Sequence, residues 1–334
     1  MKFGVALTSR LSLNDQISLA QACDTSGLSI WVPDERFFRD VFVTMSAVAT
    51  ATQHATIGSG VTDALIRHPL LTATAIASLN ELSNGRAILG IGAGISGFDA
   101  LGIHRQSPAT AVRDAVGLCR RFWSGEEVTF EGKLFSARKA HLHFETTQSP
   151  IYIAGRGPKI LTAGGELGDG VIIGHFTSEP GINFCMANIE EGIARRECTM
   201  SRPEIALWAY TSVSYDGNAA RASVKPAIGR TLRSTPEVLK LFGVQADGLL
   251  EKINQFGYAR SAAYDSAMQT IVPDELTSHL SISGTPAECV AQIQRLRKAG
   301  IDHIIALPYP AAGMEPGDMV ALLQSDVLPH IRNA

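Results

Sequence analysis

Two adjacent carboxylates, Asp34 and Glu35, follow the apolar segment Leu28–Pro33, which is predicted to be a strand. In proteins built from parallel strands, catalytic groups gather where the strands end, so Asp34 and Glu35 are candidate catalytic residues for handling a proton. An Asp in such a loop is at least as often a residue that fixes the backbone by hydrogen bonds. Both interpretations stay open on the sequence alone.

A second stretch, Ala154-Gly-Arg-Gly-Pro158, lies between a predicted strand and a predicted helix. Backbone N–H groups at a helix N-terminus favour an anion, so Gly155, Arg156 and Gly157 form a candidate phosphate site. Arg156 would add positive charge. The alternative is a simple glycine-bearing turn between a strand and a helix.

A third stretch, Gly92-Ala-Gly-Ile-Ser-Gly97, matches the letters of the dinucleotide fingerprint. That fingerprint belongs after the first strand and is answered by an acidic residue at the end of the next strand. Here the strand is the fourth, and the candidate acid, Asp114, falls in a helical pattern. We therefore interpret Gly92 and Gly94 as room for a flat ring.

Other polar residues favour structural interpretations. Arg67 and His68 precede a helix and are expected to tie the loop by hydrogen bonds, while His141 and His143 alternate on one predicted strand face. No Cys, Asp or Glu cluster completes a metal site around these two histidines. The usual motifs of serine hydrolases, zinc proteases and P-loop proteins do not occur in the sequence.

Strand and helix patterns alternate along the chain. An apolar segment followed by a capped, amphipathic segment predicts a parallel sheet with right-handed crossovers. Eight such strands favour a closed (β/α)8 TIM barrel of the α/β class, formed by residues 1–334 as a single domain. The predicted strands are Lys2–Leu7, Leu28–Pro33, Ala55–Val61, Arg86–Gly92, Pro150–Ala154, Gly170–Gly174, Glu204–Tyr215 and Ile301–Leu307.

Two segments interrupt the repeat, after the fourth and the seventh strands. Residues 125–149 contain a predicted hairpin, Glu127–Phe135, that turns at Glu131-Gly132. Residues 216–275 are helical, with no strand between Asn218 and Met268, and we expect them to form a lid that governs substrate choice. The side chains expected to furnish that lid are Arg221, Arg230, Arg233, Tyr258 and Tyr264.

Composition excludes several classes of protein. The net charge is −3 and the basic residues are scattered, which argues against a nucleic-acid surface. No apolar run is long enough to cross a bilayer, and the N-terminus lacks a cleavage site, so we expect a cytoplasmic protein. The five cysteines are widely spaced without a CxxC pair, which argues against disulfides and structural zinc.

Several motifs together resemble the luciferase-like family of flavin- and deazaflavin-dependent enzymes, above all its methylenetetrahydromethanopterin reductase branch. The joint order and spacing of these motifs carry the resemblance over most of the chain. The matching stretches are Gly58-Ser-Gly-Val-Thr62, Arg67-His68-Pro69, Ile76-Ala-Ser-Leu-Asn-Glu-Leu82, Gly85-Arg86-Ala87, Gly90-Ile-Gly-Ala-Gly94, Phe98-Asp-Ala-Leu-Gly102, Pro150-Ile-Tyr-Ile-Ala-Gly-Arg-Gly-Pro158 and Gly165-Glu-Leu-Gly-Asp-Gly170.

The resemblance implies a TIM barrel that binds coenzyme F-420 or FMN, with NAD(P)H as a possible external reductant. It also implies a cis peptide bond between Gly60 and Val61, against the back of the cofactor ring. The residues implied to bind the cofactor are Asp34, Gly60, Val61, Thr62, Gly92, Gly94, Ala154, Gly155, Arg156, Gly157, Gly174 and His175. A homodimer or higher homo-oligomer is expected, with a small-molecule substrate and no nucleic-acid or membrane partner.

The sequence departs from the resembled family at two positions. Relatives often have a catalytic His beside the matching Asp, where this chain has Glu35, and the reductase branch has a glutamate in the first strand, where this chain has Ala6. The main hypothesis is an oxidoreductase that transfers a hydride with F-420 or uses oxygen with FMN, since the cofactor carries such chemistry. The departures keep a second hypothesis open, a non-catalytic flavin-binding barrel. For a barrel hydrolase or isomerase, no acid–base pair can be named.

Overall fold

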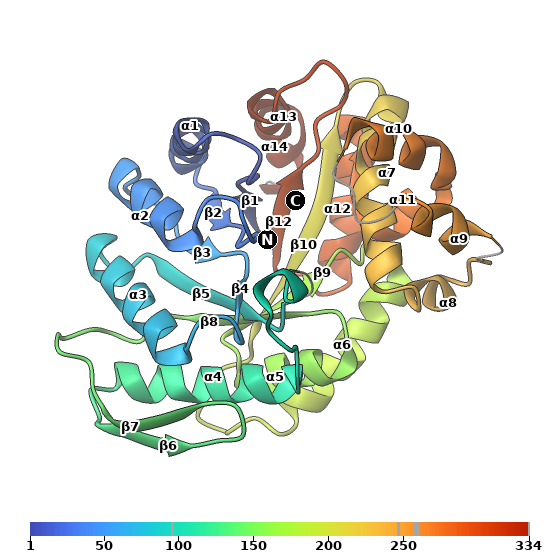
Figure 1. The fold of residues 1–334 in the computed structure, drawn as a ribbon. Helices are drawn as coiled ribbons and strands as arrows, with labels where there is room; N and C mark the ends of the chain where they lie inside the picture. Colours follow the sequence, from blue (N-terminus) through green and yellow to red (C-terminus); the bar gives the residue numbers. More distant parts are fainter. Residues whose placement is uncertain (95–96, 246–247, 257–260, 333–334) are drawn as a thin grey trace. The chain divides into compact units, whose positions relative to one another are not determined.

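The structure, a computed structural model, describes residues 1–94, 97–245, 248–256 and 261–332. Two compact units make up the chain. We call Lys2–Ile173 with Cys185–Ala206 the N-terminal unit, and Gly174–Phe184 with Leu207–Ala334 the C-terminal unit, to which Met1 also belongs. The strands of the main sheet form the parallel closed barrel of the (β/α)8 class with helices outside it, as the sequence predicts (Figure 1).

In the N-terminal unit, neighbouring strands are parallel and follow the order β1-β2-β3-β5-β8-β9. Their bounds are β1 Lys2–Ala6, β2 Ser29–Val32, β3 Ile57–Ser59, β5 Ala87–Gly92, β8 Ile151–Gly155 and β9 Gly170–Gly174. The helices between them are α1 Leu13–Thr25, α2 Val41–Ala51, α3 Pro69–Leu82, the short η1 Asp99–Leu101, α4 Pro108–Trp123 and α5 Pro158–Leu167, and α6 Glu179–Ile193 follows β9. Every residue of β5 is buried, which explains its continuous apolar sequence.

Arg86 joins the elements around the start of β5. Its guanidinium donates hydrogen bonds to the carbonyl oxygens of Ala49, Thr52, Ala55 and Ser83, at distances between 2.8 and 3.0 Å. These carbonyls belong to the ends of α2 and α3 and to the segment before β3. One half-buried cation therefore satisfies several helix-end carbonyls that would otherwise lack partners.

The predicted hairpin is confirmed, with a shift in its second strand. Strands β6 Val128–Glu131 and β7 Ser136–Ala140 pair antiparallel, and Glu131 lies opposite Ser136. The second strand therefore begins after Phe135 and not within Glu127–Phe135. The predicted third strand also differs, because it ends at Ser59 and a separate two-residue strand, β4 Thr62–Asp63, pairs with β5.

The C-terminal unit contains most of β10 Glu204–Val213, together with β11 Ser281–Gly284 and β12 His303–Pro308. Strand β11 pairs parallel with β10 from Tyr210–Ser281 to Val213–Gly284, and the sequence did not predict it. The helices of this unit are α7 Gly217–Ser234, α8 Val238–Phe242, α9 Leu249–Asn254, α10 Ala262–Ile271, α11 Glu275–Leu280, α12 Pro286–Lys298, α13 Pro316–Leu322, the π-helix η2 Leu323–Val327 and α14 Leu328–Arg332.

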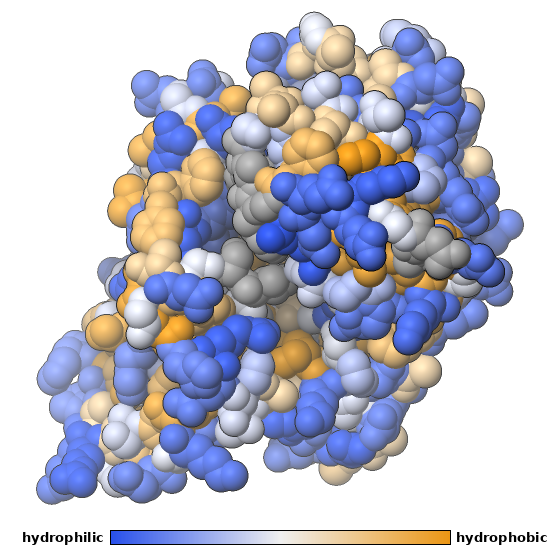
Figure 2. Space-filling view, turned by 45° about the vertical axis from the view of Figure 1, so that its right-hand side comes forward, coloured by the Kyte–Doolittle hydropathy of each residue, from blue (hydrophilic) through white to orange (hydrophobic). Residues whose placement is uncertain are grey.

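The helical segment after β10 is confirmed for its described residues, although its role as a lid stays a prediction, as does the single-domain organisation. Tyr258 lies outside the described residues. The face shown in Figure 2 is mainly hydrophilic, with apolar residues in smaller groups. Within the described part of the chain, no helix has the length and hydropathy needed to cross a membrane.

Candidate active site

Asp34 lies just beyond β2, and its side chain is half-buried. Its Oδ2 accepts a hydrogen bond from Thr62 Oγ1 at 2.8 Å. Burial raises the pKa of the Asp34 carboxyl, and the Thr62 hydrogen bond and the charge of Arg36 oppose that rise without cancelling it. A carboxyl with a raised pKa that is still partly open to solvent can hold and release a proton, which fits the role predicted for Asp34.

Glu35 points to a different partner. Its carboxylate accepts a hydrogen bond from Ser9 Oγ, beyond the end of β1, while Arg39 Nη1 donates to the Ser9 carbonyl at 3.1 Å. The two carboxylates therefore belong to separate hydrogen-bond groups. This arrangement favours Asp34 as the group for proton transfer and Glu35 as a group that fixes the loop.

The peptide bond between Gly60 and Val61 is cis, as the resemblance implied. The neighbouring strand β5 accommodates this segment closely. A Cβ at Gly90 would lie 1.9 Å from the Ser59 carbonyl oxygen, and one at Gly92 would lie 2.9 Å from Val61 Cγ2. Glycine is thus required at Gly90 by the backbone beside it, whereas the tight fit at Gly92 comes from the Val61 side chain.

The glycines after β5 have a packing role that the sequence did not reveal. A Cβ at Gly94 would lie 1.6 Å from Asp63 Oδ2, and one at Gly97 would lie 2.3 Å from Arg36 Cδ. Arg36 Nη2 is 2.8 Å from that same Asp63 oxygen, and its guanidinium carbon lies 4.6 Å from the centre of the Phe98 ring. The glycines that match the dinucleotide fingerprint therefore leave room for this ion pair. Ring binding at Gly92 and Gly94 stays a prediction.

Strand β8 ends in the loop predicted to bind phosphate. Helix α5 begins after Gly157, and no side chain caps its N-terminus. A Cβ at Gly155 would lie 2.5 Å from Ile160 Cγ2, whereas one at Gly157 would meet nothing within 4 Å. Gly157 is exposed, and Pro158 at the first position of α5 has no N–H. The Ile160 and Leu161 N–H groups donate to the Gly157 carbonyl, so the N–H groups of Gly157 and Lys159 are those that could meet an anion. This geometry suits an anion.

His175, the other predicted contact, follows β9 in a left-handed conformation with φ of 66°. Its ring stacks on Tyr210 with centroids 3.7 Å apart and planes 15° apart, and Tyr210 meets Tyr309 edge to face at 5.4 Å. Sequence reasoning did not identify Tyr210 or Tyr309. Tyr210 lies within an apolar strand and Tyr309 directly follows another strand. The sequence around each therefore gives no indication of a role in a site.

His68 has the hydrogen-bonding role expected for it, whereas the contact that the structure gives Arg67 is with an aromatic ring. His68 Nδ1 accepts a hydrogen bond from the Leu70 N–H at 3.3 Å and so caps α3, and its Nε2 lies 3.1 Å from the Ser136 carbonyl oxygen. The Arg67 guanidinium stands over the Phe42 ring at 4.8 Å.

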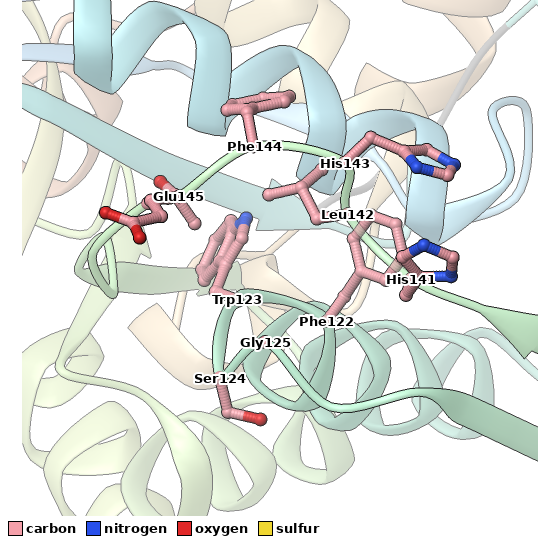
Figure 3. Close-up of a pocket in the computed structure, with 10 residues that line it drawn as sticks. Phe122, Trp123, Ser124, Gly125, His141, Leu142, His143, Phe144 and Glu145 are labelled. Atoms are coloured by element: carbon pink, nitrogen blue, oxygen red, sulfur yellow. The ribbon is translucent and has the colours of Figure 1, made fainter.

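His141 and His143 line an open hollow of about 610 Å³ beside the end of α4. Figure 3 shows the two imidazoles on one side of this hollow and Glu145 on the other, with Trp123 between them. The centroids of the two imidazole rings are 4.2 Å apart. Among the described residues, no group of three or more His, Cys, Asp or Glu side chains could hold a metal ion.

Comparison with known proteins agrees with the resemblance. A model of the family described as luciferase-like monooxygenase matches residues 1–303. The chain is 30% identical to a 5,10-methylenetetrahydromethanopterin reductase from Archaeoglobus fulgidus, over 99% of this chain and 100% of that protein. It is 25% identical to an F-420-dependent glucose-6-phosphate dehydrogenase from Rhodococcus erythropolis, over 86% of this chain and 82% of that protein.

The fold has a close match among solved structures. The coenzyme F-420-dependent tetrahydromethanopterin reductase from Methanopyrus kandleri superposes with a TM-score of 0.86 at 24% identity, covering 98% of this chain and 99% of that one. This likeness confirms the barrel. With the family match over most of the chain, it follows that the chain belongs to the luciferase-like monooxygenase family of oxidoreductases.

Proposed function

We propose that the protein is an F-420-dependent oxidoreductase that exchanges a hydride between the deazaflavin and a small organic substrate. The observation that carries this proposal is the match to the Archaeoglobus fulgidus reductase over 99% of the chain. The F-420-dependent dehydrogenase among the relatives supports the same cofactor for a different substrate. FMN is the competing cofactor, and a non-catalytic barrel is the competing class.

In this proposal the cofactor contacts are those predicted above. Gly60, Val61 and Thr62 would lie beside the ring, and the uncapped N-terminus of α5 would hold a phosphate. The bound deazaflavin supplies the hydride chemistry. Asp34 supplies the acid or base, because its raised pKa keeps a proton on the carboxyl at a higher pH than usual and Thr62 fixes its Oδ2. Gly174 and His175 stay predicted contacts.

The substrate differs from that of the reductase relatives in this proposal. Ala6 is fully buried, opposite Trp31 in the β1–β2 register, and offers no carboxylate where the reductase branch has one. We therefore do not assign methylenetetrahydromethanopterin to this protein.

A homodimer is part of the proposal. Helices α2 and α3 pack against each other, and each exposes a large apolar side chain, Val43 at 60% and Leu71 at 57%. A contiguous exposed apolar surface marks an interaction site, and the proposal assigns Val43 and Leu71 to such a surface. Light scattering should give twice the chain mass for the wild type, and the double variant V43E/L71E should give the mass of one chain. A wild-type monomer would contradict this part of the proposal.

The cofactor assignment is tested by equilibrium titration with F-420 and with FMN. We expect F-420 to bind at least about ten times more tightly than FMN, and G157E to weaken F-420 binding about tenfold because a carboxylate would stand where the phosphate binds. G117E is the matched control. It adds the same charge at an exposed position on α4 where a Cβ meets nothing within 4 Å. Unchanged F-420 affinity in G157E would remove the α5 site, and tighter FMN binding would overturn the choice of cofactor.

A further inference from the structure

Arg230 stands at the centre of a polar and aromatic cluster in the C-terminal unit. Its side chain is 14% exposed, and its guanidinium carbon lies 5.5 Å from the centre of the buried Tyr264 ring. Tyr309 lies near enough for its hydroxyl oxygen to favour the charged guanidinium. Burial lowers the pKa of Arg230, but the oxygens of the neighbouring tyrosines raise it, and the net shift is upward. The guanidinium therefore stays charged at every physiological pH.

The cluster lies where strands end. His175 directly follows β9, Tyr309 directly follows β12, and Tyr210 comes from β10. In barrels of this class the carboxyl ends of the strands carry the active site. His175, Tyr309 and Arg230 each keep part of their surface open to solvent, whereas Tyr210 beneath them is 8% exposed. The charged group is thus held in a partly desolvated position that a ligand can reach.

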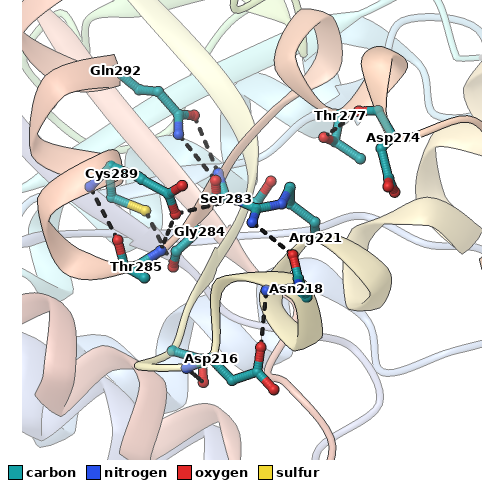
Figure 4. Close-up of polar contacts among 12 residues, drawn as sticks. Asp216, Asn218, Arg221, Asp274, Thr277, Ser283, Gly284, Thr285, Cys289 and Gln292 are labelled. Atoms are coloured by element: carbon teal, nitrogen blue, oxygen red, sulfur yellow. Dashed lines mark hydrogen bonds and ion pairs between the residues drawn. The ribbon is translucent and has the colours of Figure 1, made fainter.

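Contacts made by other residues fix helix α7, so the position of the helix does not depend on Arg230. Figure 4 shows contacts at the first turns of α7, where Asp216 caps the helix and Arg221 reaches Asn218. Arg221 also pairs with Glu288 at 3.1 Å. Further along α7, Ser223 Oγ donates to the Tyr309 carbonyl oxygen at 2.7 Å, and Lys225 pairs with Asp274 at 2.6 Å.

The pairing of Arg230 with Asp265 is looser than these contacts. Its Nη1 lies 3.4 Å from Asp265 Oδ1, and the Asp265 side chain is 32% exposed. Helix α10 is already fixed to α7 by close packing at Gly229, where a Cβ would lie 2.7 Å from Met268 Sδ. A guanidinium has five N–H donors, and the contacts of Arg230 to described oxygen atoms engage Asp265 and Tyr309. Its remaining donors can bind a ligand.

We propose that Arg230, with the Tyr309 hydroxyl near it, binds an oxyanion group of the substrate, a carboxylate or a phosphate. The planar guanidinium matches such a group in two-pronged geometry, and the Tyr309 O–H can act as a further donor to it. This inference rests on the proposed function, because it assigns Arg230 and Tyr309 to the substrate.

The test uses the full-length protein and three probes that share a phenyl ring: benzoate, phenyl phosphate and benzamide, the neutral isostere of benzoate. Their affinities are measured by ligand-observed NMR. We expect one of the two anions to bind the wild type at least about tenfold more tightly than benzamide, and R230M to abolish that preference while leaving benzamide binding unchanged. The tighter anion identifies the substrate group as carboxylate or phosphate. R221M is the matched control, an arginine on the same helix that faces Glu288, and it should behave as the wild type.

Equal binding of the three probes to the wild type, or an unchanged anion preference in R230M, would overturn the proposal. If R230M does not fold, Y309F decides, since it removes one hydroxyl beside the same group and should reduce the anion preference about threefold. F-420 affinity of the same samples is measured separately. If the wild type does not bind F-420, the proposed function is wrong. If the wild type binds F-420 but shows no anion preference, only the proposed oxyanion site is wrong.

Discussion

Two arginines with nearly equal burial have different roles in the two units. Arg36 is 15% exposed and Arg230 is 14% exposed, and each stands over an aromatic ring, Phe98 and Tyr264 respectively. Arg36 lies 2.8 Å from a buried carboxylate, whereas Arg230 lies 3.4 Å from a partly exposed one. The burial of an arginine therefore does not reveal its role. The closeness of its ion pair does, because Arg36 and Asp63 hold two buried charges together, whereas the looser pair of Arg230 leaves its guanidinium able to bind a ligand.

The largest expected effect is on stability. R36M leaves the buried Asp63 carboxylate without its partner, and we expect a loss of about 3 kcal/mol in the free energy of unfolding. R230M leaves a partly exposed carboxylate in water and should cost less than about 1 kcal/mol. Urea unfolding of both variants measures the difference. Similar losses would mean that Arg230 is a structural arginine too.

The next effect separates catalysis from binding. D34N removes the proposed proton-transfer group and should lower kcat about 100-fold with a nearly unchanged KM, for whichever substrate supports F-420 turnover. R230M should instead raise KM about tenfold with kcat retained. Steady-state kinetics of the two variants with one substrate tests this pattern, and an unchanged kcat in D34N would remove Asp34 from the mechanism.

A smaller effect concerns the glycine beside Asp63. Gly94 and Gly102 have similar φ values, 59° and 64°, but a Cβ at Gly94 would strike the Asp63 carboxylate while one at Gly102 meets nothing within 4 Å. G102A should cost about 1 kcal/mol for the left-handed conformation alone, and G94A at least about 2 kcal/mol. Thermal unfolding of the pair gives the difference. Equal losses would show that the ion pair yields easily to a methyl group.

The smallest effect is a pH dependence. Burial raises the pKa of folded Asp34 above its ordinary value of 3.8, so between these two values the folded state binds more protons than the unfolded state. The contribution of Asp34 to stability is therefore full at low pH and is lost as the pH rises through the raised pKa. The unfolding free energy of the wild type minus that of D34N should therefore fall as the pH rises through that window. A difference that rises with pH would contradict the assigned direction.

Regular alternation of strands and helices made the barrel predictable, whereas long-range contacts did not show in the sequence. Strand β11 was missed because Ser281-Ile-Ser-Gly284 has one apolar side chain, and pairing with β10 makes it a strand. Gly94 and Gly97 are glycines because Asp63 and Arg36, distant in sequence, occupy the space beside them. The cis bond at Gly60 was predicted through family resemblance, since nothing in the local spacing indicates it.

The site was predicted in part for the same reason. Asp34 could be found because it follows a predicted strand. The structure adds the hydrogen bond from Thr62 and the burial that raises the pKa of the Asp34 carboxyl. Arg230 was one of several charged residues in a helical segment. Only the fold shows that it meets Tyr309 and Tyr264, while Arg221 meets Glu288.

The most direct test of the central claim is the identity of the cofactor that the protein retains when it is purified from a host that makes both F-420 and FMN. Mass spectrometry and the absorption spectrum of the released compound identify it. The account predicts a deazaflavin with a phosphate-bearing side chain, bound in the wild type and depleted in G157E but not in G117E. FMN retained in place of the deazaflavin would contradict the account.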